Sequence, residues 1–136
     1  MRHLNRYICT LIILAGSFSS CKTPPFDHAY IIKIQNNSTK LIVYLASYNY
    51  PDTTIPDQQN QLSGVSPNDY TPKDSKEDWS TVLGRAPGKK ISIFFFSPDT
   101  ITKYGWETVR NNYNILARKD FSIQDLDTSS YKIAYP

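Results

Sequence analysis

The sequence predicts a mainly β fold, an antiparallel β-sandwich or open barrel of about six strands with one or two short helices. Aromatic residues make up 13% of the chain and include ten Tyr, and aromatic residues favour strands. Apolar residues recur at every second position in several segments, which is the spacing of a half-buried strand. Strands do not alternate with long helices, so a parallel sheet is not expected.

Two runs rich in Ile, Val, Leu and Tyr predict the first strands. They cover residues 30–35 and 41–46. The segment between them, 36–40, is polar and contains Asn and Ser, which favour turns. We therefore expect these two strands to pair as an antiparallel hairpin.

A long irregular loop is expected over residues 49–76. This segment contains four Pro, many Asp, Asn, Gln and Ser, and few aliphatic residues. Pro has no amide hydrogen to donate to a neighbouring strand, so it disfavours a regular sheet. Residues 79–83, which follow, fit a short strand.

The strongest strand is expected at residues 90–97. Their sequence, KISIFFFS, indicates burial on both faces and therefore a central place in a sheet. Residues 86–89 before it fit a type II turn, with Pro87 second and Gly88 third.

A helix, a strand, a short helix and a last strand complete the expected order. Ser97 and Pro98 are typical of a helix start. The helix is expected near residues 99–111, broken or kinked at Gly105, with a buried stripe of Ile101, Tyr104 and Val109. The later elements are a strand at 113–121, a short acid-capped helix opened by residues 122–125, and a strand at 131–135.

The first 20 residues predict a lipoprotein signal peptide. Residues 1–6 are basic, residues 7–15 are apolar and residues 16–20 are mostly small. The apolar stretch is shorter than the roughly 20 residues that cross a bilayer. The order of basic, apolar and small residues is that of a secretory signal, and Cys21 follows the small residues as in a bacterial lipobox.

Cys21 is therefore the predicted lipidation site. The lipobox is a loose version, because Phe18 and Ser20 stand where Leu and Gly or Ala are usual. Acyl chains on this thiol would anchor the protein by burying methylene groups in the bilayer. The alternative is ordinary signal cleavage near Ser17 or Ser20, which would leave a free thiol.

The predicted domains after the signal are a lipidated flexible tether, residues 21–29, and a single β-rich globular domain, residues 30–136. Pro24 and Pro25 favour an extended tether. Lys22, directly after the Cys, favours the outer membrane over retention at the inner membrane. The sequence leaves open whether the domain faces the periplasm or the cell surface.

The charge balance argues against nucleic acid as a partner. The chain has 15 Lys and Arg against 12 Asp and Glu, but Arg2 and Arg6 lie in the predicted signal. The mature chain is nearly neutral, whereas nucleic-acid-binding domains carry a basic patch. The expected partners are the membrane, through the N-terminal lipid, and an envelope protein or a glycan.

Few residues could support catalysis or hold a metal ion. His28, in the tether, is the single His of the mature chain, so a Ser-His-Asp or Cys-His site has no positioned imidazole. Zinc would lack ligands for the same reason. We predict no metal, no cofactor and no enzymatic activity. A carboxylate-dependent hydrolase stays as an alternative, with Glu77, Asp78, Glu107 and Asp120 as its candidate groups.

Tyr48, Tyr50 and Tyr70 are the candidate contacts for a ligand or a partner. They lie in or beside the Pro-rich segment. A tyrosine presents a flat apolar ring with a polar tip, which suits glycans and proteins. A glycan-binding module would expose these three rings on one surface. Trp79 and Trp106 are expected in the core.

Several segments resemble small lipoproteins of Bacteroidota. The similar blocks are YNYPDT at 48–53, FFSPDTITKY at 95–104, WETVRNN at 106–112 and the ending IAYP at 133–136. The resemblance spans most of residues 30–136 and implies a location in the cell envelope but no activity. Asp52-Thr53-Thr54 also resembles the O-glycosylation site of these bacteria, which makes Thr53 a candidate modified residue.

These features together predict a lipid-anchored cell-envelope protein that acts as a non-enzymatic binding or assembly module. A carboxylate-dependent hydrolase and a glycan-binding module are the alternatives.

Overall fold

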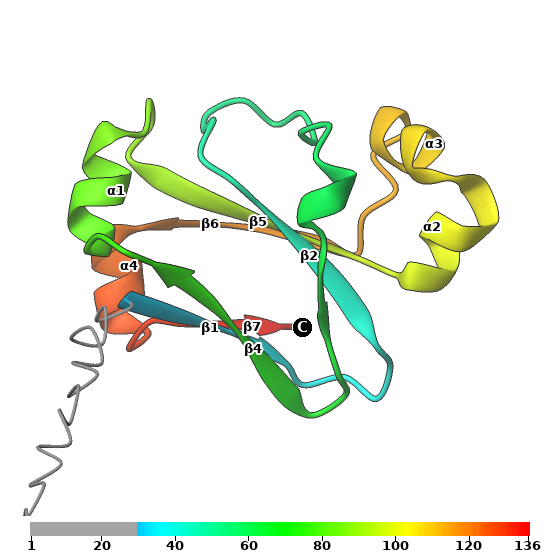
Figure 1. Cartoon of the computed structure of the whole chain (residues 1–136), viewed down its shortest axis with the longest axis horizontal. Helices are drawn as coiled ribbons and strands as arrows, with labels where there is room; N and C mark the ends of the chain where they lie inside the picture. Colours follow the sequence, from blue (N-terminus) through cyan, green and yellow to red (C-terminus); the bar gives the residue numbers. More distant parts are fainter. Residues whose placement is uncertain (1–29) are drawn as a thin grey trace, which may run out of the picture.

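The computed structural model describes residues 30–136. They form seven strands in two sheets and four α-helices (Figure 1). The strands are β1 (Tyr30–Asn36), β2 (Ile42–Ser47), β3 (Ser63–Val65), β4 (Asp69–Ser75), β5 (Lys90–Phe96), β6 (Ala117–Ser122) and β7 (Lys132–Tyr135). The helices are α1 (Trp79–Arg85), α2 (Pro98–Tyr104), α3 (Trp106–Asn111) and α4 (Ile123–Thr128), and a 3₁₀ helix covers Gln59–Gln61. The predicted mainly β, sandwich-like fold is confirmed.

The predicted signal peptide, the tether with His28 and the lipidation site Cys21 lie outside the described residues. Over residues 30–136, no helix is long and apolar enough to cross a bilayer.

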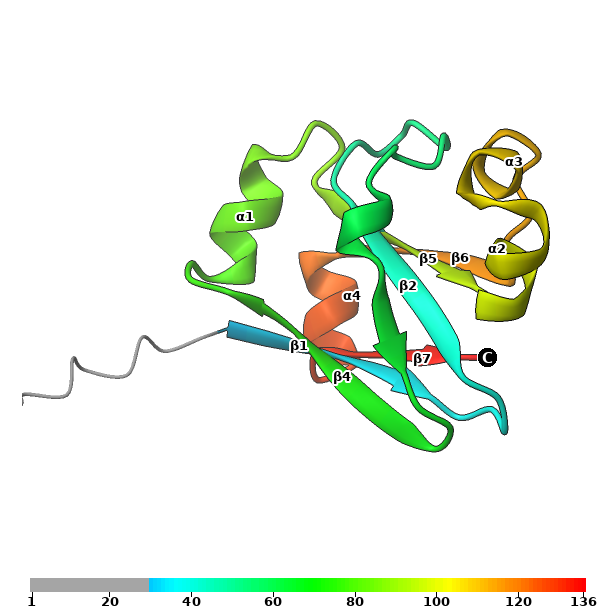
Figure 2. The ribbon, with the colours of Figure 1, turned by 45° about the vertical axis from the view of Figure 1, so that its right-hand side comes forward.

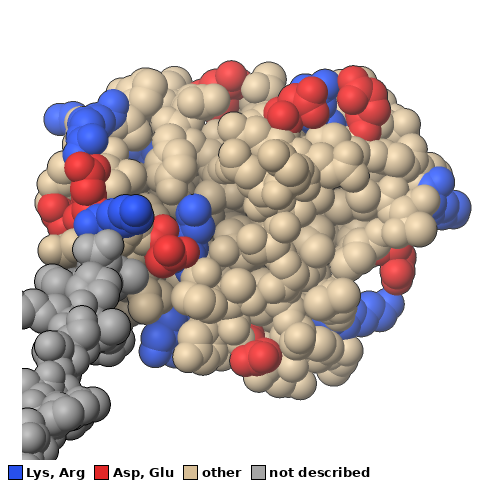
Figure 3. Space-filling model, viewed as in Figure 1, with Lys and Arg blue, Asp and Glu red and all other residues tan. Residues whose placement is uncertain are grey.

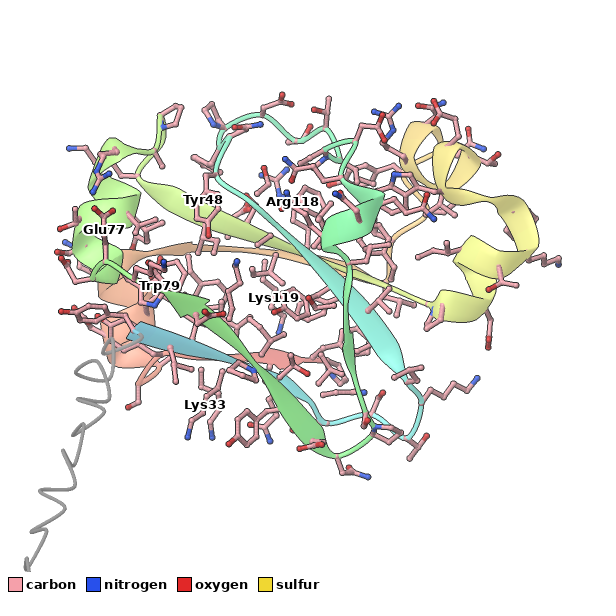
Figure 4. The ribbon with its side chains drawn as sticks, viewed as in Figure 1. Lys33, Tyr48, Glu77, Trp79, Arg118 and Lys119 are labelled. Carbon is pink, nitrogen blue, oxygen red and sulfur yellow. The ribbon has the colours of Figure 1, made fainter. Side chains whose placement is uncertain are left out.

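Two sheets pack face to face. The first sheet has the order β4–β1–β7 and the second has the order β3–β2–β5–β6. All neighbouring strands are antiparallel except β1 and β7, which are parallel. On the side where β6 and β7 form the two sheet edges, the Lys119 amine donates to the Ala134 carbonyl at 2.6 Å (Figure 4). This contact ties the two sheets together, and a lysine at a strand edge also discourages pairing with another chain.

β5 is buried on both faces, as its sequence predicts. Phe95 points into the main core between the sheets, whereas Phe94 and Phe96 pack in a second cluster on the opposite face. Trp106 of α3 belongs to this second cluster, and Trp79 of α1 belongs to the main core, so the predicted burial of both Trp residues is confirmed. Helices α2 and α3 thus form a third layer beyond the second sheet (Figure 2).

The predicted hairpin of the first two strands is wrong. β1 and β2 belong to different sheets and do not pair. Asn36, which is fully buried, holds the connection in place, because its amide nitrogen donates to the carbonyls of Lys40 at 2.8 Å and Val65 at 3.0 Å. The connection therefore turns from one sheet to the other and places the apolar faces of β1 and β2 on opposite sides of one core.

The prediction of an irregular loop over residues 49–76 is also wrong in its second half. This segment contains the 3₁₀ helix, β3 and β4. β4 is an edge strand that pairs with β1 alone, and none of its residues is buried. A strand at an edge tolerates Pro72 and charged side chains, so its sequence lacks the apolar alternation by which strands are recognised.

Residues 79–83 form a helix, not the predicted strand. The Asp78 carboxylate accepts a hydrogen bond from the amide of Thr81 at 2.9 Å and caps α1.

The turn at 86–89 forms, but the positive φ lies at Lys89 (52°), so it is not the predicted type II turn. Gly88 is required for another reason, since a Cβ there would collide with Tyr50.

The helical segment after β5 breaks at Gly105, where φ is +80°, as predicted. Ser97 caps α2 with Pro98 in its first turn, which is also confirmed. Tyr104 is 49% exposed and does not join the predicted buried stripe.

Ser122 and Asp125 form a capping box that opens α4, and this short acid-capped helix was predicted. The strand expected from residue 113 begins only at Ala117, because Tyr113 has a positive φ of 54°.

Candidate functional site

The described chain enters at one end of the sandwich, and a groove opens at the other end. The described chain enters at Tyr30, beside α1 and α4 (Figure 1). The Trp79 indole nitrogen donates to the Tyr30 carbonyl at 3.2 Å and holds this entry against α1. β1 then runs about 20 Å along the sheet. At its far end a groove of about 630 Å³ opens.

The groove is formed by segments that are distant in the sequence. They are the loop after β1, the start of β2, the first turn of α2, the residue before β6 and the end of β7. Asn36 fixes the loop, because its side-chain oxygen accepts hydrogen bonds from the Ser38 amide at 2.9 Å and the Ser38 hydroxyl at 2.7 Å. Together with its bonds to two carbonyls, this buried amide shapes one wall before any ligand arrives.

The lining of the groove combines apolar residues, Ser and Thr residues, and two opposite charges. Leu41 and Leu116 are 50% and 44% exposed, and Tyr135 packs on Phe95 with 5.3 Å between the ring centroids. Ser and Thr residues add hydroxyl groups to this lining. Lys40 and Asp99 bring one positive and one negative charge, so the lining as a whole is neutral. Such a surface suits an uncharged or weakly polar segment.

The three predicted contact tyrosines do not share one surface. Tyr48 follows β2, is half-buried and packs against the main core. The Lys90 amine lies 4.9 Å from the centroid of the Tyr50 ring. Tyr70 is 51% exposed, but it lies in β4 on the other sheet, with the Lys33 amine 5.3 Å from its ring centroid. A single platform of three rings is therefore not present.

Thr53, the candidate O-glycosylation site, is exposed in the loop after β2. The neighbouring Asp52 carboxylate accepts hydrogen bonds from the Thr54 amide at 2.8 Å and the Thr54 hydroxyl at 3.0 Å. These bonds lower the pKa of Asp52. Accessibility allows modification of Thr53, which stays a prediction.

The candidate carboxylates are spread over the molecule and bound to structural partners. Glu77 pairs with Arg85 at 2.5 Å beside α1, and Glu107 pairs with Arg110 at 3.1 Å on α3. Asp78 caps α1, and hydrogen bonds from Ser80 and Thr81 lower its pKa to about 2. Glu77 and Arg118, the partner of Asp120, lie in different parts of the fold (Figure 4).

A polar cluster on the outer face of β5 and β6 was not predicted from the sequence. It consists of Ser92, Arg118 and Asp120, and we call it the locked cluster. The Ser92 hydroxyl donates to Asp120 at 2.6 Å, and the Arg118 guanidinium donates to Asp120 at 2.8 Å and to Ser92 at 3.3 Å. Burial alone would lower the pKa of Arg118, but hydrogen bonds to Asp120 and Tyr113 raise it.

Two members of the locked cluster are nearly buried. Ser92 is 1% exposed, and the Arg118 side chain is 11% exposed and lies 5.3 Å from the Phe94 ring centroid, whereas the Asp120 side chain is 28% exposed. Every member donates to or accepts from another member, so the three side chains hold one another in place. The alternation of Arg118 and Asp120 along β6 is the signal that would have placed both on one face.

Metal ligands do not gather in the part of the chain that the structure describes. Among residues 30–136, no three His, Cys, Asp or Glu side chains come together in a way that could hold an ion.

Comparison with known protein families, with curated protein sequences and with solved structures finds no match to this chain. The likeness to Bacteroidota lipoproteins therefore depends on the sequence blocks alone and stays a prediction.

Proposed function

We propose that this chain is a lipid-anchored, non-enzymatic binding module of a bacterial cell envelope, most consistent with the outer membrane. The groove at the far end of β1 is its partner site. The observation that carries the proposal is the opposition of the two ends, because the chain enters at Tyr30 while the open, preformed groove lies about 20 Å away. A lipid on Cys21 would thus attach the chain on the side of the domain opposite the groove.

The chemistry of the groove favours a segment of a partner protein. Its exposed leucines offer apolar contact, and its Ser and Thr residues offer hydroxyl groups as both donors and acceptors. Protein interfaces likewise combine apolar and polar contacts. The wall held by Asn36 needs little reorganisation, so less ordering entropy opposes binding.

The state of the carboxylates supports a role without catalysis. Asp52, Asp78 and Asp125 have pKa values that are lowered by hydrogen bonds from neighbouring Ser and Thr residues. A general acid of a hydrolase needs a raised pKa, so these three carboxyls are unsuited to that role. Glu77 and Glu107 each face an arginine.

Photocrosslinking in native cells tests the proposal. A photoreactive phenylalanine derivative replaces Leu116 in the groove of the full chain, and the matched control carries it at Gln124, an exposed position of α4 near the chain entry. We expect one discrete crosslinked protein from Leu116 and none from Gln124. Crosslinks of equal pattern at both positions, or none at Leu116, would contradict a partner site in the groove.

The alternative of a carboxylate-dependent hydrolase makes a different prediction. Hydrolysis of a peptide or glycan panel by the purified protein that is lost in Glu107→Gln or Asp120→Asn would support it. We expect no hydrolysis above buffer by the unaltered chain.

A further inference from the structure

A second, smaller pocket lies where β2 ends. Its volume is about 180 Å³, and we call it the amide pocket. It is formed by residues 46–49 at the end of β2 and by three residues of the segment that leads into the 3₁₀ helix, Pro56, Gln58 and Gln61. The groove described above shares no residue with it.

No residue that lines the amide pocket carries a charge. The sequence between Asp57 and Asp69, QQNQLSGVSPN, also contains no charged residue. In the space-filling view, the middle of the face over β2 and β3 is free of Lys, Arg, Asp and Glu, whereas charges gather around its margin (Figure 3). A charged ligand would find no counter-charge here, so a neutral ligand is favoured.

The side-chain amides of the pocket are free to bind a ligand. Among residues 30–136, hydrogen bonds engage the backbone amides of Asn49, Gln58 and Gln61, but none engages their side-chain amides. Each such amide offers one oxygen acceptor and two N–H donors. A sugar hydroxyl is both a donor and an acceptor, so a cluster of free amides matches a ring that carries several hydroxyls.

Tyr48 supplies the apolar surface that a sugar ring also needs. Its ring is half-buried against the main core, which restricts its rotation, and Tyr48 also lines the amide pocket. Burial, and to a lesser extent the neighbouring Tyr44, raise the pKa of Tyr48, so its hydroxyl remains a neutral donor at physiological pH. Aromatic faces pack on the C–H surfaces of ligands while the hydroxyl stays available for hydrogen bonding.

We propose that the amide pocket binds one ring of a neutral oligosaccharide, with Tyr48 under the ring and Asn49, Gln58 and Gln61 bonded to its hydroxyls. The pocket is smaller than sites for drug-sized ligands, so one ring fills it and the rest of the chain lies along the uncharged surface. With so few atoms enclosed, we expect a dissociation constant on the order of 1 mM. The proposal does not depend on the partner in the groove.

A titration with defined sugars tests the proposal. The full chain is kept in micelles of a detergent without a sugar head group, and saturation-transfer NMR is recorded with maltotetraose, cellotetraose and N-acetylated chitotetraose. A tetramer of galacturonic acid is the charged comparison. We expect at least one neutral tetramer to bind and the acidic one not to bind. Absence of binding for all three neutral tetramers, at concentrations on the order of 10 mM, would overturn the proposal.

Variants then locate the bound ring. Tyr48→Ala should weaken binding by roughly ten-fold, and Gln58→Ala and Gln61→Ala by roughly three-fold each. Tyr70→Ala is the matched control, because Tyr70 is an exposed tyrosine on the other sheet. If Tyr48→Ala does not fold, the two glutamine variants decide, since neither side chain is buried. Unchanged binding in those variants, or an equal loss in Tyr70→Ala, would place the sugar elsewhere and overturn the proposal.

Discussion

Two polar groups of residues adjoin the second sheet, and they differ in how their hydrogen-bonding capacity is used. In the locked cluster, the hydroxyl of Ser92, the guanidinium of Arg118 and the carboxylate of Asp120 bond to one another. In the amide pocket, the side-chain amides of Gln58 and Gln61 have no partner within residues 30–136. The first set carries charge and is bonded within itself, whereas the second is uncharged and open.

Polar groups that bond to one another stabilise the fold, whereas polar groups without a protein partner are available to bind a ligand. A charged group that is removed from water must be satisfied inside the fold, or it lowers stability. An exposed amide can bond to water instead of to the protein, so its donors and acceptor remain available to a ligand. Arg118 and Asp120, at alternate positions of β6, bond to each other and so belong to the first kind.

The largest effect on stability is expected for Asn36→Ala. This residue holds a wall of the groove, so its hydrogen bonds can be compared with those of the locked cluster. The change removes a fully buried amide and leaves the Val65 carbonyl without this donor, whereas the Lys40 carbonyl can still accept from the Ser38 hydroxyl at 3.0 Å. We expect the free energy of unfolding to fall by about 3 kcal/mol. Urea denaturation measures the loss, and hydrogen exchange should show faster opening of the loop at residues 37–41. A loss below about 1 kcal/mol would mean that the wall is not held by this side chain.

Arg118→Ala tests whether the locked cluster is structural. The substitution leaves Asp120 and Ser92 without their cation and uncovers the Phe94 ring. Because the side chain of Asp120 is 28% exposed, water offsets part of the loss, and we expect about 2 kcal/mol of destabilisation, less than for a fully buried pair. Binding of a neutral tetramer should stay unchanged. A fall in sugar binding with unchanged stability would show that the locked cluster serves binding and not stability, and would contradict this account.

Asp78 predicts an acid-dependent contribution to stability. Its pKa is lowered from 3.8 to about 2 by hydrogen bonds from Ser80 and Thr81. A carboxyl whose pKa is depressed in the folded state contributes stability above its unfolded pKa, and this contribution is lost as pH falls through the folded pKa. We expect Asp78→Asn to flatten the decline in stability between pH 3.8 and 2. Thermal melts across this range, compared with Asp99→Asn, measure it, and identical pH profiles would contradict the cap.

The smallest effect on stability is expected for Gln58→Ala. The side chain is not buried, and its amide has no partner among the described residues. We expect a change in the free energy of unfolding within about 0.5 kcal/mol, together with weaker binding of the neutral tetramer. Destabilisation above about 1 kcal/mol would show that the amide is engaged in the fold.

Elements that depend on local signals could be predicted from the sequence. The central strand follows from its continuous apolar run, the helix break from Gly105 and the start of α4 from the pairing of Ser122 with Asp125. Each of these signals lies within a few residues of the feature that it determines.

Features that depend on distant partners could not be predicted. Asn36 and Val65 are 29 residues apart, and their hydrogen bond joins the end of β1 to β3 of the other sheet. β4 is held by pairing with β1 at an exposed edge and shows no apolar alternation. The groove combines loop, strand and helix segments from residues 38–42, 97–100, 116 and 135, so no spacing in the sequence reveals it.

The candidate ligand residues show the same division. Tyr48 was recognised because an aromatic ring beside a Pro-rich segment is visible in the sequence, whereas Gln58 and Gln61 were not, because only the fold brings them to Tyr48. Tyr70 lies on the other sheet.

The mass of the mature protein, purified from native membranes, tests most directly whether the domain is anchored through a lipid on Cys21. We predict a chain that begins at Cys21 and carries a diacylglycerol on sulfur and an acyl group on its amine. A free thiol at Cys21, or a chain that retains residues 1–20, would contradict the anchor.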